Sequence, residues 1–160
     1  MSGCEWEGTS EQMITHLEQS HTEIVQFEEN DVLLIPDYEM YDGHRDLLLG
    51  LSDYEVHNDY RKIITYDDRV FVALITARNQ IWRFVLLCVG SWEIAQTYEY
   101  CIELSSSGKG SIKATYQVHS IKADLEQVYT LCQCFKLPLD VVVQFIIGND
   151  LKFRFTVTKI

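Results

Sequence analysis

The chain lacks the two sequence features that direct a protein into or across a membrane. No stretch approaches the roughly 18 uncharged apolar residues of a spanning helix. The N-terminus has no basic patch followed by an apolar core, so no signal peptide is indicated. We therefore expect a soluble intracellular protein. Its 160 residues, 47% of them hydrophobic, suffice for one main domain with a single core.

Basic residues are scarce, which argues against nucleic acid as a partner. The chain has 13 Lys and Arg against 24 Asp and Glu, a net charge of −11, whereas phosphate binding depends on clustered bases. The imbalance lies in residues 1–59, which carry fifteen acidic side chains and only Arg45 as a base; residues 60–160 have a net charge of +3. The acidic part is either a solvated edge or a surface that steers a basic partner.

Disulfide and catalytic patterns are also missing. Five cysteines, an odd number scattered through strand-like sequence, do not form a disulfide framework, so we expect reduced thiols. Cys88 and Cys101 stand in apolar surroundings and are expected to pack in the core. No nucleophile or acid stands beside a positioned base, and 105–111 lacks the spacing of a phosphate-binding loop. We therefore expect no catalysis within this chain.

Three apolar runs at 70–76, 81–89 and 98–104 organise the sequence. They are seven to nine residues long and rich in β-branched and aromatic residues, which favours strands. Their short links predict antiparallel pairing of neighbours in a β-meander. The first two runs should be covered on both faces, whereas the third alternates and should be half exposed. Alternation and turn residues predict further strands at 24–27, 32–35, 112–118 and 151–160, and 132–135 reads as a short strand.

The N-terminal segment carries part of a zinc-binding pattern. Thr9 and Gln12 resemble a capping box that begins a helix over 10–19. Four residues separate His16 from His21, and eleven separate Cys4 from His16, which matches part of a Cys2His2 site. The fourth ligand is missing. Either the chain has been cut inside the finger or no zinc binds.

The same residues resemble a known family. Cys4-Glu5-Trp6-Glu7-Gly8, followed by His16-Leu17 and His21, is similar to the end of the zinc-finger region of the seven-in-absentia (SINA/SIAH) family. Segments 98–104, 114–121 and 148–157 resemble later strands and turns of that family, in the same order. The resemblance thus covers nearly the whole chain, apart from an insertion at 37–58.

The resemblance implies an all-β fold, a TRAF-like antiparallel β-sandwich of about eight strands, preceded by a short zinc-finger helix. Residues 1–21 would be the end of the finger, and 22–160 the substrate-binding domain. Such a domain binds substrates or adaptors of a RING-type ubiquitin ligase for proteasomal degradation, forms homodimers, and works in the cytoplasm or also the nucleus. The RING, which would engage the ubiquitin-conjugating enzyme, would lie in a longer parent. Zinc would be held by Cys4, His16 and His21.

The family also implies a groove that takes an extended peptide as an added strand. Matching positions assign peptide binding to Val25, Phe27, Asp59, Tyr60 and Lys62. Phe27 could equally be a core residue. Tyr60 stands where the family has Trp, and Lys62 where it has Met, which puts the Pro-containing peptide preference in question. A second hypothesis is a scaffold or oligomerisation module whose groove is closed by the 37–58 insertion.

Overall fold

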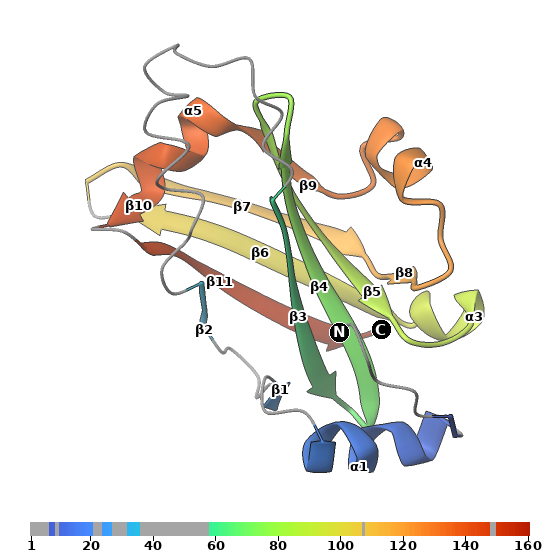
Figure 1. Cartoon of the computed structure of the whole chain (residues 1–160). Coiled ribbons are helices and arrows are strands. Elements are labelled where there is room, and N and C mark those ends of the chain that lie inside the picture. The colour runs from blue at the N-terminus through green and yellow to red at the C-terminus, as the bar shows by residue number, and fades with distance from the viewer. Residues whose placement is uncertain are drawn as a thin grey trace.

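Two β-sheets packed face to face make up most of the part of the chain that the computed structural model describes (Figure 1), which comprises residues 7–8, 10–20, 24–26, 32–35, 58–106, 108–147 and 150–160. The first sheet has the strand order β1-β3-β4-β5, with β8 and β9 both paired to β5. Its strands are β1 (Ile24–Gln26), β3 (Asn58–Tyr66), β4 (Arg69–Arg78), β5 (Ile81–Cys88), β8 (His119–Ser120) and β9 (Phe135–Pro138).

The second sheet has the order β10-β11-β6-β7, with β2 also paired to β11. Its strands are β2 (Val32–Ile35), β6 (Tyr98–Ser106), β7 (Gly110–Gln117), β10 (Ile146–Ile147) and β11 (Asp150–Lys159). The helices are α1 (Ser10–Ser20), α3 (Trp92–Ala95), α4 (Leu125–Thr130), α5 (Leu139–Val142) and the 3-10 turn η1 (Val143–Phe145). Eight of the described strands have four or more residues, and pairing is antiparallel except for β1–β3 and β5–β8. The predicted all-β sandwich of about eight strands is confirmed.

The predicted three-stranded meander is wrong at its second link. β4 and β5 pair antiparallel as expected, but β6 belongs to the second sheet. The free edge of β5 is already taken, because β9 pairs with residues 81–84 and β8 with Leu87 and Cys88. Between β5 and β6, α3 is capped at its N-terminus by Ser91, whose Oγ accepts a hydrogen bond from the Ile94 amide, and the helix buries Ala95. The link thus carries the chain from one sheet to the other.

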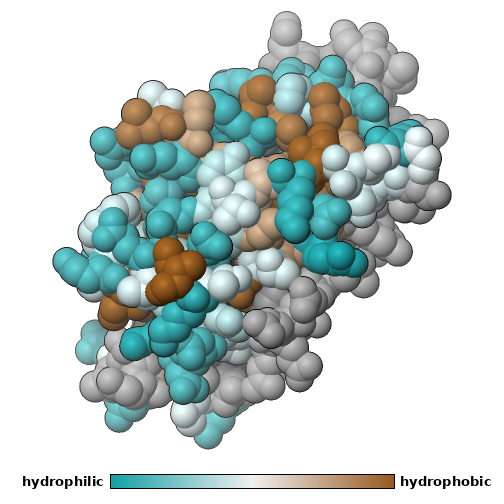
Figure 2. All heavy atoms as spheres, turned by 180° about the vertical axis from the view of Figure 1, so that it is seen from behind, coloured by the Kyte–Doolittle hydropathy of each residue, from teal (hydrophilic) through white to brown (hydrophobic). Residues whose placement is uncertain are grey.

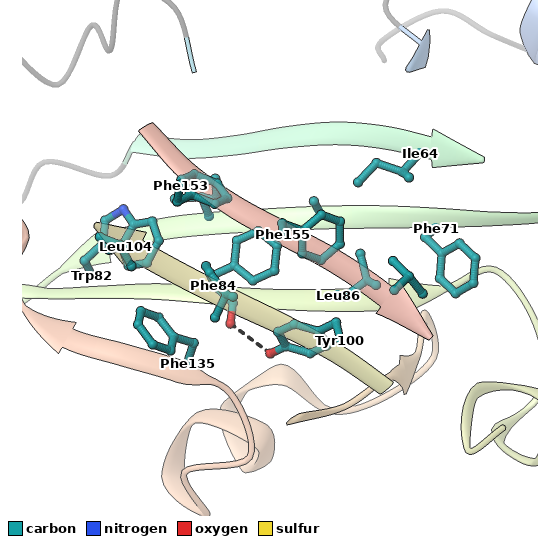
Figure 3. Packing of buried hydrophobic residues seen from close by; sticks show 14 of the residues in the cluster. Ile64, Phe71, Trp82, Phe84, Leu86, Tyr100, Leu104, Phe135, Phe153 and Phe155 are labelled. Carbon is teal, nitrogen blue, oxygen red and sulfur yellow. Dashed lines mark hydrogen bonds between the residues drawn. The ribbon is translucent and has the colours of Figure 1, made fainter. Parts of the chain in front are cut away.

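Aromatic side chains fill the space between the sheets (Figure 3). The Phe84 ring of β5 lies 5.2 Å from Phe155 and 5.6 Å from Phe153, measured between ring centroids, and both partners come from β11. From β6, the Tyr100 ring lies 5.5 Å from Phe84, and its hydroxyl donates to the Phe84 carbonyl oxygen at 3.2 Å. These contacts join the two sheets at the centre of the core.

The outer faces of the two sheets differ. On the first sheet, Val128 of α4 packs against Leu74 and Val85, so β4 and β5 are covered on both faces, as predicted. The second sheet lies behind the first in Figure 1, and the view from behind in Figure 2 is mostly teal and white. There β6 alternates between buried and half-buried residues, which confirms its predicted pattern.

Two smaller predictions need correction. Cys88 is buried as expected, but Cys101 is half-buried on the outward-facing side of β6, so its assignment to the core is wrong. The short strand predicted at 132–135 begins only at Phe135. Cys132 instead belongs to the turn that follows α4, where its φ of 57° is incompatible with extended backbone.

Candidate functional site

The candidate site is the outer edge of β3, which we call the β3 edge and define as residues 58–62. All of β3 pairs with β4 on one side. On the other side, β1 pairs in parallel with residues 63–65 alone, so within the described part of the chain residues 58–62 have no strand beside them. An edge of this kind presents a row of backbone N–H and C=O groups that a further extended chain can pair with.

Strand alternation places the predicted peptide-binding positions on two faces. Tyr60 is in register with Ile75 and Lys62 with Ala73, two buried core residues, so positions 60 and 62 belong to the core-facing side of the first sheet. Asp59 pairs with Thr76 and belongs to the opposite side. The structure thus brings two of the three predicted β3 positions onto one face.

The two predictions in the N-terminal strand have different outcomes. Val25 lies in β1 in register with Ile64, on the same face of the sheet as position 62. It therefore lies next to the end of the β3 edge. Phe27 lies outside the described residues, and so does the 37–58 insertion except for its last residue, Asn58, which begins β3.

Lys62 gives the β3 edge its chemical character. Its side chain is half-buried, and its neighbour across the sheet is the small, fully buried Ala73. The aliphatic stem of a lysine can cover apolar surface while its ammonium reaches water or an oxygen acceptor. The edge therefore combines an apolar surface with a positive charge. The methionine that the SINA/SIAH family has at the position of Lys62 would supply an apolar contact alone.

Helix α1 packs near the end of β3 that β1 occupies. Met13 contacts a small cluster that contains Ile63 of β3 and Val70 of β4. In Figure 1 the helix lies across the lower ends of these two strands. The predicted helix over 10–19 is confirmed within one residue at its C-terminal end.

The predicted zinc ligands are only partly described. His16 lies in α1, half-buried, with its Nδ1 3.4 Å from Ser20 Oγ. Cys4 and His21 fall outside the described residues, among which no group of three or more His, Cys, Asp or Glu could hold a metal. A single imidazole does not make a zinc site. Zinc binding by Cys4, His16 and His21 therefore stays a prediction.

A polar contact that the sequence did not indicate ties the two sheets together at one end. Asp67, in the β3–β4 turn, accepts hydrogen bonds from Tyr98 Oη at 2.7 Å and from Lys159 Nζ at 2.8 Å. Both hydrogen bonds lower the pKa of Asp67, and the bond from Lys159 is the larger cause. Burial is the main cause that raises the pKa of Tyr98. Asp67 is separated from these partners by 31 and 92 residues, so no local pattern could reveal the cluster.

Neither the family models nor the curated proteins supply a relative of this chain. No protein-family model matches the chain, and a search of curated proteins returns no match. Among the described residues, no helix is both long enough and apolar enough to cross a membrane. The similarity to the SINA/SIAH family therefore stays a prediction made from the motifs quoted above.

Proposed function

We propose that this chain is a substrate- or adaptor-binding domain that captures an extended peptide as an additional strand on the β3 edge. The observation that carries the proposal is the incomplete pairing of β3 on the side away from β4, where β1 pairs with residues 63–65 and no described strand lies beside residues 58–62. The bound peptide would extend the first sheet beside β3. The motif resemblance supports its assignment to a SINA-type RING ubiquitin ligase that directs bound proteins to proteasomal degradation.

Binding would divide into two contributions. Backbone hydrogen bonds to the β3 edge supply affinity for any extended chain, and side-chain contacts at alternate positions supply selectivity. Positions 60 and 62 share the core-facing side, so alternate peptide residues would contact them. Because Lys62 brings an ammonium to this side, we expect the preferred peptide to differ from that of a groove with an apolar residue at this position.

The test is a titration with a fluorescent Val-x-Pro peptide, measured by anisotropy. The Phe27→Ala/Tyr60→Ala double variant should lose saturable binding. Trp92→Ala is the matched control, because Trp92 is an aromatic residue 47% exposed on α3, outside the β3 edge. Binding that survives unchanged in the double variant would show that the groove assignment is wrong.

A second peptide series tests strand addition itself. N-methylation removes a backbone donor without changing the side chains. Methylating the alternate amides that face β3 should abolish binding, whereas methylating the other alternate set should have little effect. Equal effects of both sets would exclude pairing along a strand edge.

The competing proposal is a scaffold or oligomerisation module whose groove is closed by the 37–58 insertion. It is supported by the acidic composition of the insertion and by Lys62 at a position where the family has Met. Deleting the insertion should then create peptide binding that the intact chain lacks. Absence of any gain would contradict closure of the groove.

A further inference from the structure

Four basic side chains gather on the face of the first sheet that is turned away from the core. They come from four adjacent strands: Arg61 of β3, Arg78 of β4, Arg83 of β5 and Lys136 of β9. We call these four residues the basic patch. Because β3, β4 and β5 pass in front of β6 in Figure 1, this face is turned toward the viewer.

The register of the sheet fixes how close these residues lie. One row of residues that stand opposite one another on neighbouring strands consists of Thr76, Arg83 and Lys136. Arg78 lies two residues after Thr76 along β4, in the next row on the same face, close to the β4–β5 turn. Arg61 stands opposite Leu74, which lies two residues before Thr76 along β4 on the same face. Neighbouring strands are about 4.8 Å apart and successive same-face residues about 7 Å apart, so the basic patch spans roughly 14 Å in each direction.

The charge of the basic patch contrasts with that of the chain. Four of the 13 basic residues lie in these three rows, although the net charge of the protein is −11. Among the described residues, the one acidic position in the same rows is Asp59, in register with Thr76. Arg61, Arg78 and Lys136 are exposed, and Arg83 is half-buried. Lys136 Nζ donates to Cys132 Sγ at 2.8 Å, and the three exposed side chains bring the basic patch into contact with solvent at the margin of the face that α4 covers.

Two buried polar atoms at the centre of the basic patch have no hydrogen-bond partner among the described residues. They are Oγ1 of Thr76, a residue that is 3% exposed, and the Nε of Arg83, which stands directly across from Thr76 on the neighbouring strand. The guanidinium lies 5.3 Å from the centre of the Tyr129 ring, and its Nη1 donates to the carbonyl oxygens of Arg78 and Ile81 at 3.4 Å. Buried donors are almost always paired. An oxygen acceptor entering beside Arg83 would supply the missing partner.

We infer that the basic patch docks an acidic peptide segment of a partner protein, one with successive Asp and Glu residues. Carboxylates form charge-assisted, often paired hydrogen bonds with guanidinium groups, and a segment with several of them would meet the exposed Arg78 and Lys136 together with Arg83. The net charge of the chain disfavours a nucleic acid, whose phosphates form a denser polyanion that a strongly negative protein repels. Arg61 belongs both to this surface and to the β3 edge, but the surface lies on the opposite face of the sheet from positions 60 and 62.

The test uses a fluorescent eight-residue peptide of alternating Glu and Asp, titrated into the full chain and followed by anisotropy. The Arg78→Gln/Lys136→Gln variant should bind about five- to tenfold more weakly at about 0.15 M salt, and wild-type affinity should fall as salt increases. Lys113→Gln/Arg154→Gln removes the same charge from exposed positions on the second sheet and should leave affinity nearly unchanged.

Further variants and control ligands distinguish binding at the basic patch from attraction by the charge of the protein as a whole. Arg78→Lys/Lys136→Arg should retain binding. Phe27→Ala/Tyr60→Ala should also retain it, because neither residue belongs to the basic patch and position 60 is on the other face of the sheet. Equal weakening in both glutamine variants would overturn the inference, as would equal binding of a Gln/Asn peptide. Tighter binding of a single-stranded RNA of the same length would overturn it as well. Equal melting temperatures of the glutamine variants and the wild type would show that the substitutions leave the fold intact.

Discussion

Replacing Phe84 with alanine should be among the most damaging single changes to this fold. The side chain is fully buried, and its ring contacts Tyr100 of β6 and both Phe153 and Phe155 of β11, at centroid separations of 5.2 to 5.6 Å. Removing a buried phenylalanine costs about 3–5 kcal/mol, since apolar burial is lost and a cavity remains. Three ring contacts favour the upper half of that range, because each aromatic pair adds about 0.5–1.5 kcal/mol beyond burial.

Urea unfolding at 25 °C, followed by tryptophan fluorescence, measures this loss. Trp82 is fully buried, 6.0 Å from Phe153 between ring centroids, so its emission should shift to longer wavelength when the sheets separate. A domain of this size typically has about 5–15 kcal/mol of stability, so the variant should still fold in water if the wild type is not at the low end. With an m-value of about 2 kcal/mol/M, a loss in the upper half of that range lowers the urea midpoint by roughly 2–2.5 M.

Leu131→Ala provides the matched control. Leu131 is 56% exposed in the turn after α4, so its truncation should change the free energy of unfolding by no more than about 0.5 kcal/mol. If Phe84→Ala cost less than about 1 kcal/mol, or no more than Leu131→Ala, the packing of β5 against β6 and β11 would be refuted.

Two further predictions concern titration and thiol reactivity. The pKa of Asp67 is lowered from its ordinary value of 3.8, chiefly by the hydrogen bond from Lys159, so this contact stabilises the folded state above about pH 4 and is lost as the pH falls through the lowered pKa. The melting temperature of wild type should therefore exceed that of Asp67→Asn at pH 7, and the difference should shrink toward pH 2; a constant difference would contradict this. Cys132 is exposed, whereas Cys88 is buried and its pKa is raised by that burial, so a thiol reagent should label Cys132 in the native protein and Cys88 only after unfolding. Mass spectrometry that found both equally labelled in native buffer would contradict the placement of Cys88.

Most of the strands were predicted from the alternation of apolar and polar residues along the sequence. In β11, Phe153, Phe155 and Val157 are buried while Arg154 is exposed, as the two-residue period predicted. Such a pattern can be read from sequence because it needs only that one face of the strand be covered. The sheet to which each strand belongs could not be read from the sequence in this way. A short link between β5 and β6 predicted pairing, but the outcome depended on β8 and β9 occupying the edge of β5, and those strands come later in the chain.

The candidate sites show the same limit. The position of Tyr60 and Lys62 on a strand followed from a motif resemblance. That no described strand lies beside them depends on β1, which pairs with residues 63–65. The basic patch was not predicted, since it depends on the register between four strands. Its only sequence signal was the positive net charge of residues 60–160, which gives the sign of a surface without its location. Long-range register therefore determines both sites.

Amide hydrogen exchange tests peptide capture at the β3 edge most directly. It would be measured on the full chain with and without a saturating Val-x-Pro peptide, residue by residue. Strand addition predicts slower exchange at the edge-facing amides of residues 58–62. The edge of β7, which has no neighbour beyond it among the described strands, serves as the internal control and should not change. Unchanged exchange at 58–62, or equal protection of β7, would contradict the proposed peptide-binding edge.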